Sequence, residues 1–222
     1  MIKKFLLLLL IFNLTPQTSS AAAPQELNLS RLNTSQLEDI YEYYDYKGVR
    51  GYLMLPGYHY PPIYLSSFPT DFDAVADEQK RIALFIKILA PLALRFNQQT
   101  LEQRQVIEQI KQNFDKNHEL SAEESRIIEK TAAEYDVFTR LKGSQRHKFL
   151  LTELLNRVDA IPPSFLIAAA AMETNWGTSR IVKEGNSLYK QLVWHSDKGL
   201  KPRGETEDDT YRIRTFPTIY DS

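Results

Sequence analysis

Apolar residues recur at helical spacing through the middle of this chain. After Asp77, intervals of three and four residues place one set of them on a single face: Ile82, Phe85, Ile86, Leu89 and Ala93. This spacing predicts a helix with a kink at Pro91, since proline has no N–H for the helical hydrogen bond. A second predicted helix follows Thr100, with Ile107, Ile110 and Phe114 in line.

Two further helices are predicted before residue 160. Ser121 and Glu124 match the capping box, in which the serine side chain bonds forward and the glutamate side chain bonds back, so a helix should run from there through Tyr135. A fourth helix has Leu151, Leu154, Leu155 and Val158 on one face. Stripes of this kind are typical of helix packing, so we interpret them as core rather than as sites of chemistry.

The N-terminus has the pattern of a secretory signal peptide. Lys3 and Lys4 precede a short apolar run from Phe5 to Phe12, and small residues at 19–23 offer a cleavage site. A retained anchor is the alternative, but the run is too short to span a bilayer. We therefore predict a signal peptide at residues 1–23 and an exported protein of the periplasm or cell envelope, with no transmembrane anchor after cleavage.

Residues 24–69 are rich in tyrosine and proline. Eight of the twelve tyrosines fall between Tyr41 and Tyr64. This composition predicts an extended arm with few helices. The aromatic rings of this arm could stack on sugars. We prefer the interpretation that its tyrosines pack against a helical core and hold the arm there.

Composition excludes several kinds of site. The chain has no cysteine, which excludes disulfides, thiol catalysis and thiolate metal ligands. Its four histidines, His59, His118, His147 and His195, are scattered, so we expect no metal and no cofactor. Without Lys3 and Lys4, 25 of the 27 basic residues remain against 28 acidic ones, a net charge of −3. This balance gives no support for nucleic-acid binding.

The segment after residue 160 holds the candidate chemistry. Pro162 and Pro163 end one helix and favour the start of the next. Residues 165–172 are apolar all round, which predicts a helix buried on every side. Glu173 stands at the end of this run, and Trp176 and Gly177 follow it.

Glu173 is the candidate catalytic acid. We expect partial burial at the mouth of the core to raise its pKa, with Trp176 one turn later as an apolar wall. Glycosidic cleavage needs such a carboxylic acid to protonate the leaving oxygen. The alternative is a glutamate that ends a helix in solvent or pairs with Arg180 or Lys183, and spacing alone does not decide between the two.

Two neighbouring motifs resemble a known family. Ala171-Met172-Glu173-Thr174-Asn175-Trp176-Gly177-Thr178-Ser179 is followed by Glu184-Gly185-Asn186-Ser187-Leu188-Tyr189. Together they are similar to the paired signature of the bacterial glucosaminidases, the flagellar-muramidase-like glycoside hydrolases. The order of segments, with Val158-Asp159-Ala160-Ile161-Pro162-Pro163 before the motif, resembles the Bax-like branch.

The resemblance implies an α+β, mostly helical fold. A helical region at 70–144 would precede a lysozyme-like glucosaminidase domain at 145–222. Members cleave the β-1,4 bond after N-acetylglucosamine in peptidoglycan strands, the expected partner, and Glu173 corresponds to the general acid. Gly177 and Ser179 would form the turn into a short helix that Gly185 and Asn186 end.

The partners of Glu173 are less well defined by sequence. If a second carboxylate acts, Glu205 or Glu207 is preferred within the acidic run 205–209, although a solvated loop also explains that run. Trp176, Tyr189 and Trp194, with His195, can line a sugar groove, but a strand packed on the core would equally use Tyr189 and Trp194.

The end of the chain resembles the point where family members continue into helices that close the groove. The domain at 145–222 is then either incomplete, which is the preferred interpretation, or of a shorter form used by this branch. Three functions remain open: peptidoglycan hydrolysis, lytic transglycosylation, and non-catalytic glycan binding or scaffolding in the envelope.

Overall fold

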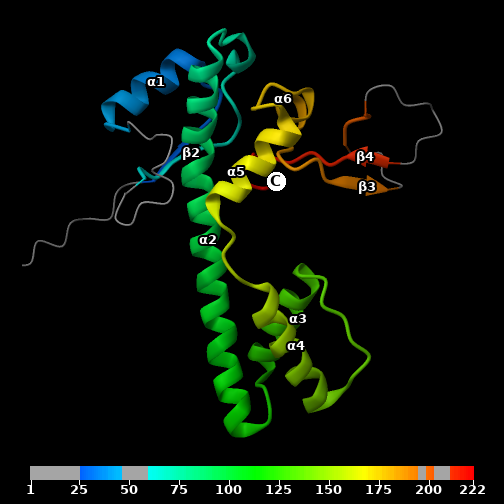
Figure 1. Cartoon of the computed structure of the whole chain (residues 1–222). Helices are drawn as coiled ribbons and strands as arrows, with labels where there is room; N and C mark the ends of the chain where they lie inside the picture. Colours follow the sequence, from blue (N-terminus) through cyan, green and yellow to red (C-terminus); the bar gives the residue numbers. More distant parts are fainter. Residues whose placement is uncertain (1–25, 47–59, 195–198, 203–210) are drawn as a thin grey trace, which may run out of the picture.

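A single helix of 40 residues, α2 (Glu78–Asn117), forms the axis of the molecule (Figure 1). The computed structural model describes residues 26–46, 60–194, 199–202 and 211–222, so the predicted signal peptide lies outside the described residues. Asp77 caps α2 by accepting hydrogen bonds from the backbone N–H groups of Gln79 and Lys80. The predicted division into two helices near Thr100 is wrong, because the Thr100 hydroxyl donates to the Phe96 carbonyl and is satisfied inside one continuous helix.

The helix also continues through Pro91. A proline cannot donate to the carbonyl four residues earlier, which here belongs to Lys87. The Tyr46 hydroxyl donates to that carbonyl oxygen at 3.1 Å. A side chain from the N-terminal region therefore replaces the backbone donor that Pro91 lacks.

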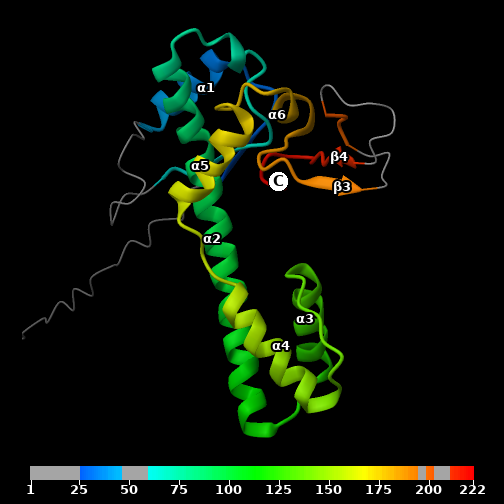
Figure 2. The ribbon, with the colours of Figure 1, turned by 45° about the vertical axis from the view of Figure 1, so that its right-hand side comes forward.

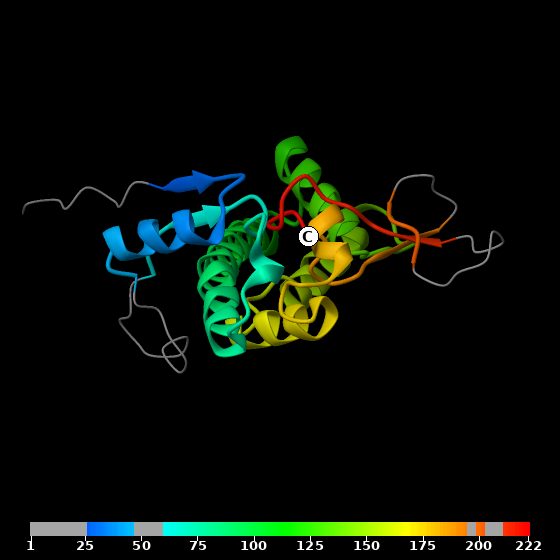
Figure 3. The ribbon, with the colours of Figure 1, turned by 90° about the horizontal axis from the view of Figure 1, so that it is seen from above.

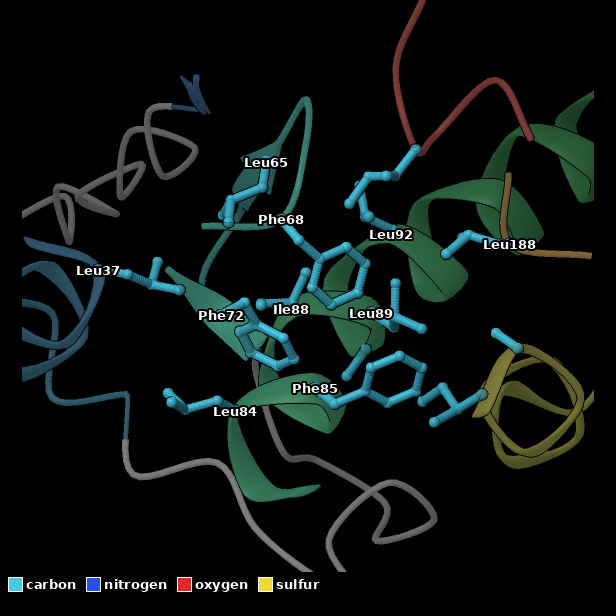
Figure 4. Packing of buried hydrophobic residues seen from close by; sticks show 14 of the residues in the cluster. Leu37, Leu65, Phe68, Phe72, Leu84, Phe85, Ile88, Leu89, Leu92 and Leu188 are labelled. Atoms are coloured by element: carbon cyan, nitrogen blue, oxygen red, sulfur yellow. The ribbon is translucent and has the colours of Figure 1, made fainter. Parts of the chain in front are cut away.

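Two hydrophobic cores form on opposite halves of α2. The N-terminal half packs with the N-terminal segments and with the helix that holds Glu173, around buried residues that include Leu37, Phe68, Phe72, Phe85 and Ile88 (Figure 4). The C-terminal half packs with α3 (Ala122–Glu134) and α4 (Gly143–Arg157), around Ile107, Ile128 and Leu154 (Figure 2). Both α3, with its capping box at Ser121 and Glu124, and α4 confirm the helices predicted from sequence.

The segment predicted as an extended arm contains a helix, which corrects the sequence-based expectation. Asn33 and Gln36 form a capping box at the start of α1 (Thr34–Tyr43). Strand β1 (Leu27–Leu29) precedes α1 and pairs in parallel with β2 (Ile63–Leu65). Tyr41 and Tyr46 are almost fully buried, so these tyrosines do fasten the segment to the helical core.

Two polar side chains of α2 hold the connection between the cores. The Asn97 amide donates to the Ile161 carbonyl at 2.6 Å and accepts from the Ile161 N–H at 2.9 Å. One guanidinium nitrogen of Arg104 donates to the carbonyls of Leu155 and Val158, at 2.6 and 2.8 Å, where α4 ends. These bonds fix where the chain leaves α4 and enters the next helix.

The C-terminal part consists of two helices and a hairpin. Helix α5 (Pro163–Thr174) crosses α2, and the short α6 (Arg180–Gly185) follows it. Strands β3 (Leu192–Trp194) and β4 (Tyr211–Ile213) pair antiparallel and extend away from α2, on the side opposite β1 and α1 (Figure 3). The described residues are therefore mostly helical with two small sheets. None of their helices is both long and apolar enough to cross a bilayer.

The Tyr46 hydrogen bond can be tested with a double-mutant cycle. Tyr46→Phe should lower the free energy of unfolding by about 1 kcal/mol, because it leaves the Lys87 carbonyl without a donor. In a Pro91→Ala background the cost should be much smaller, since the substituted alanine supplies a backbone N–H to that carbonyl. Denaturant titration of the four proteins gives the coupling.

Tyr41→Phe is the matched control, since the buried Tyr41 hydroxyl has no hydrogen-bond partner among the described residues. Removing it should leave the stability unchanged or raise it. An equal cost of Tyr46→Phe with and without Pro91 would contradict the proposed role of the bond.

Candidate active site

The turn after Glu173 is built from three consecutive residues with positive φ. Asn175, Trp176 and Gly177 have φ values of 49°, 55° and 79°. A Cβ at Gly177 would lie 2.8 Å from a ring carbon of Phe68 and 3.0 and 3.1 Å from ring carbons of Phe72 and Phe85. The turn is therefore seated on phenylalanine rings at a point where only glycine fits.

Thr174 connects helix and turn from inside the protein. Its hydroxyl donates to the Ala170 carbonyl at 2.6 Å and accepts from the Gly177 N–H at 3.0 Å. Thr174 is fully buried, so both bonds are shielded from water. The hydroxyl of Thr174 therefore joins the end of α5 to the turn at Gly177.

The second motif fastens α6 to the end of the chain. Asn186 ends α6 in the left-handed conformation, and its amide donates to the carbonyls of Phe216 and Pro217 at 3.2 and 3.1 Å. The Gly185 carbonyl accepts from the Phe216 N–H at 2.9 Å. The positions of Gly177, Ser179, Gly185 and Asn186 at the two ends of α6 agree with the predicted turn and cap.

Glu173 lines a groove of about 750 Å³ between α5, α6 and the β3–β4 hairpin. Its other lining residues include Asn175, Ser179, Arg180, Lys183, Glu184, Lys190, Pro202 and Tyr211. The carboxyl side chain is exposed, so the expected partial burial is wrong. The groove is large enough for sugar residues of a glycan.

The apolar helix is not buried on every side either. Phe165 is 66% exposed and Met172 is 84% exposed, while Ile167, Ala170 and Ala171 face the core. The small alanine side chains gave no amphipathic pattern from which the outer face could be predicted. Because successive helical residues point about 100° apart, burial of Thr174 turns Glu173 outward.

The predicted aromatic residues lie in three different places. Trp194 is 59% exposed on the hairpin, and its ring lies 5.3 Å from that of its cross-strand partner Tyr211, which lines the groove. Trp176 instead packs edge-on against Phe85 in the core, with ring centroids 5.5 Å apart. The positive φ at Asn175 and Trp176 explains this, because the chain no longer follows the helix at that point.

Tyr189 lines a different cavity, of about 260 Å³, between α2, α5 and the end of the chain. Its hydroxyl donates to the Leu166 carbonyl at 3.4 Å, and burial raises the pKa of its phenol. The structure thus places Glu173 and Tyr211 in one groove and leaves Trp176 and Tyr189 outside it. Trp194 contacts Tyr211 but is not itself among the lining residues.

Most charged groups around Glu173 pair with one another. Arg180 pairs with Glu184 at 3.1 Å, and its guanidinium also donates to the Lys201 carbonyl. Lys183 pairs with Asp73. The carboxyl of Glu173 therefore pairs with neither cation, and Glu184 is the other carboxylate among the described lining residues.

Glu205 and Glu207 lie outside the described residues. The described residues on either side of that segment, Pro202 and Tyr211, both line the groove. Sequence reasoning did not single out Tyr211, Glu184 or Lys190 as lining residues. Glu184 belongs to the second motif, which assigned it no role, and Tyr211 and Lys190 lie outside both motifs.

Comparisons of the chain with protein-family models, with curated proteins and with solved structures found no match.

The seating of the turn can be tested by replacing Gly177. Gly177→Ala should be destabilising for two reasons. The left-handed φ costs about 1–2 kcal/mol for a residue with a Cβ. The contact of that Cβ with three rings costs about 1–3 kcal/mol more. Gly143→Ala is the control, since Gly143 has a φ of 56° but no atom within 4 Å of the added Cβ. Chemical denaturation should show a larger loss for Gly177→Ala, and equal losses would refute the packing argument.

Proposed function

We propose that this protein is a glycosidase of bacterial cell-wall glycan with Glu173 as its general acid. The observation that supports this most is the position of Glu173 in an open groove that Tyr211, the ring partner of Trp194, also lines. Sugar-binding sites combine an acid with flat aromatic surfaces, because rings pack on the apolar faces of pyranoses.

The two motifs of the glucosaminidase resemblance support the same proposal. The first ends α5 at the groove, and the second contains the end of α6, where Glu184 lines the same groove. The Ser187 N–H donates to the Ile181 carbonyl at 3.2 Å, so the second motif folds back on α6. A lysozyme-like arrangement, with the acid where a core helix ends and a β-hairpin across the groove, is the finer fold that this proposal implies.

The chemistry assigns one step to Glu173. Its carboxylic acid would donate a proton to the glycosidic oxygen as the bond between that oxygen and C1 breaks. In hydrolysis, water then adds to C1 and loses a proton, and a proton returned to the Glu173 carboxylate restores the acid. The product has a new reducing end, which the family resemblance implies is N-acetylglucosamine. The groove would hold the sugar so that its leaving oxygen faces Glu173.

The decisive variant is Glu173→Gln, which keeps the size of the side chain and removes the acid. Digestion of purified cell walls should fall by about 100-fold or more. The Glu173 carboxyl makes no hydrogen bond or ion pair with the described residues, so the midpoint of thermal unfolding should not change. Glu119→Gln is the control and should digest like the wild type. Glu119 is exposed and lies between α2 and α3, next to the other hydrophobic core.

Equal digestion by the wild type and Glu173→Gln would refute the role of Glu173. If neither protein digests cell walls but both bind them, the non-catalytic function in glycan binding or scaffolding replaces the enzyme.

A lytic transglycosylase is the second candidate, and one observation favours it. Glu184, the other described carboxylate of the groove, is held by Arg180, so it is poorly suited to activate water. A transglycosylase needs no activated water, because a hydroxyl of the cleaved sugar itself attacks C1. Mass spectrometry of the products distinguishes the two: anhydro sugars identify a transglycosylase, and reducing ends identify a hydrolase.

A further inference from the structure

Lys190 occupies an unusual position in the Glu173 groove. It has a φ of 48°, in the left-handed region, although its side chain is long and exposed. A residue with a Cβ pays roughly 1–2 kcal/mol for this conformation, and glycine would avoid the cost. Eight non-glycine residues of the described chain have a positive φ, and three of them are the C-caps of α2, α5 and α6. Lys190 is not such a cap, and the surrounding structure must maintain its conformation.

The charge of Lys190 is also different from that of its neighbours. The groove cations Arg180 and Lys183 are each within 4 Å of an acidic partner. Lys190 has no such partner among the residues that the structure describes. Its ammonium group therefore stays available to an anion that enters the groove.

We propose that Lys190 is a specificity residue that binds a carboxylate of the glycan. This inference rests on the proposed function, since it assumes that a glycan lies in the groove next to Glu173. A cell-wall strand from which the stem peptides have been removed bears a free lactyl carboxylate on every second sugar. The same group is a neutral amide where a peptide is attached, and a chitin strand has no such group. A lysine in the same groove as Glu173 would thus favour peptide-free strands and fix the register of their sugars relative to Glu173.

The position of Lys190 suits this role. It lies directly after Tyr189, whose hydroxyl donates to the Leu166 carbonyl of α5, and directly before Gln191, whose carbonyl accepts from the Arg214 N–H at 2.7 Å. Both neighbours are thus fastened, one to the core and one to β4. The backbone of Lys190 is held at the rim while its flexible side chain reaches solvent.

The test measures binding in the Glu173→Gln background, so that it does not depend on cleavage. The ligands are soluble, uncrosslinked glycan strands without peptides, and the same strands with their carboxylates converted to amides. Lys190→Gln should weaken binding of the carboxylate strands about three- to fivefold at low ionic strength, as expected for an exposed ion pair. The loss should shrink as salt is added, and the preference for carboxylate over amidated strands should disappear.

Two further variants complete the experiment. Lys190→Arg should keep the preference, because it keeps the charge. Lys148→Gln controls for net charge and should also keep the preference for carboxylate strands. Lys148 is an exposed residue of α4, which packs on the other hydrophobic core.

The proposal is overturned if Lys190→Gln weakens both ligands equally, if it changes neither, or if the Glu173→Gln protein binds neither ligand. Failure of the proposed enzyme gives a different result. In that case the wild type leaves cell walls intact while Lys190→Gln still abolishes the preference for carboxylate strands.

Discussion

Both hydrophobic cores of this protein form on one helix, so their arrangement depends on α2 remaining helical through Pro91. The Tyr46 hydroxyl makes this possible by donating to the Lys87 carbonyl. Because Tyr46 belongs to the N-terminal region, α2 is completed only when that region has folded onto it. The buried Tyr41 and Tyr46 pack against α2, and Tyr46 in addition supplies a hydrogen bond to its backbone.

The candidate site depends on the same helix through a second set of contacts. Phe85 of α2 packs against Trp176, and with Phe68 and Phe72 it forms the surface under Gly177. This surface determines where α5 ends, and the buried Thr174 hydroxyl determines how it ends. Glu173 is exposed as a direct consequence, because its neighbour Thr174 uses the face that points inward.

Sequence periodicity predicted α3 and α4 well, since each has a regular apolar stripe and clear end signals. It failed where the relevant interaction was not periodic. Helix α1 has few apolar positions and is defined by the capping box of Asn33 and Gln36, within a segment whose tyrosines and prolines suggested extended chain. The place of Trp176 depends on two positive φ values, which helical spacing does not reveal, and the outer face of α5 could not be recognised among alanines. Glu173, which the motif singled out, is one of the residues that line the groove.

The exposure of Glu173 changes how the proposed catalysis would have to work. In a buried site the protein itself excludes water from the acid, whereas in an open groove the bound glycan must do so. Binding and proton transfer would then be coupled, because each sugar that covers the carboxyl also contacts the walls. Tyr211 and Lys190 lie on those walls and not in the core, so both would act by placing the glycan over Glu173. An acid that depends on its substrate for shielding would remain in water, and unreactive, until a strand of the right register fills the groove.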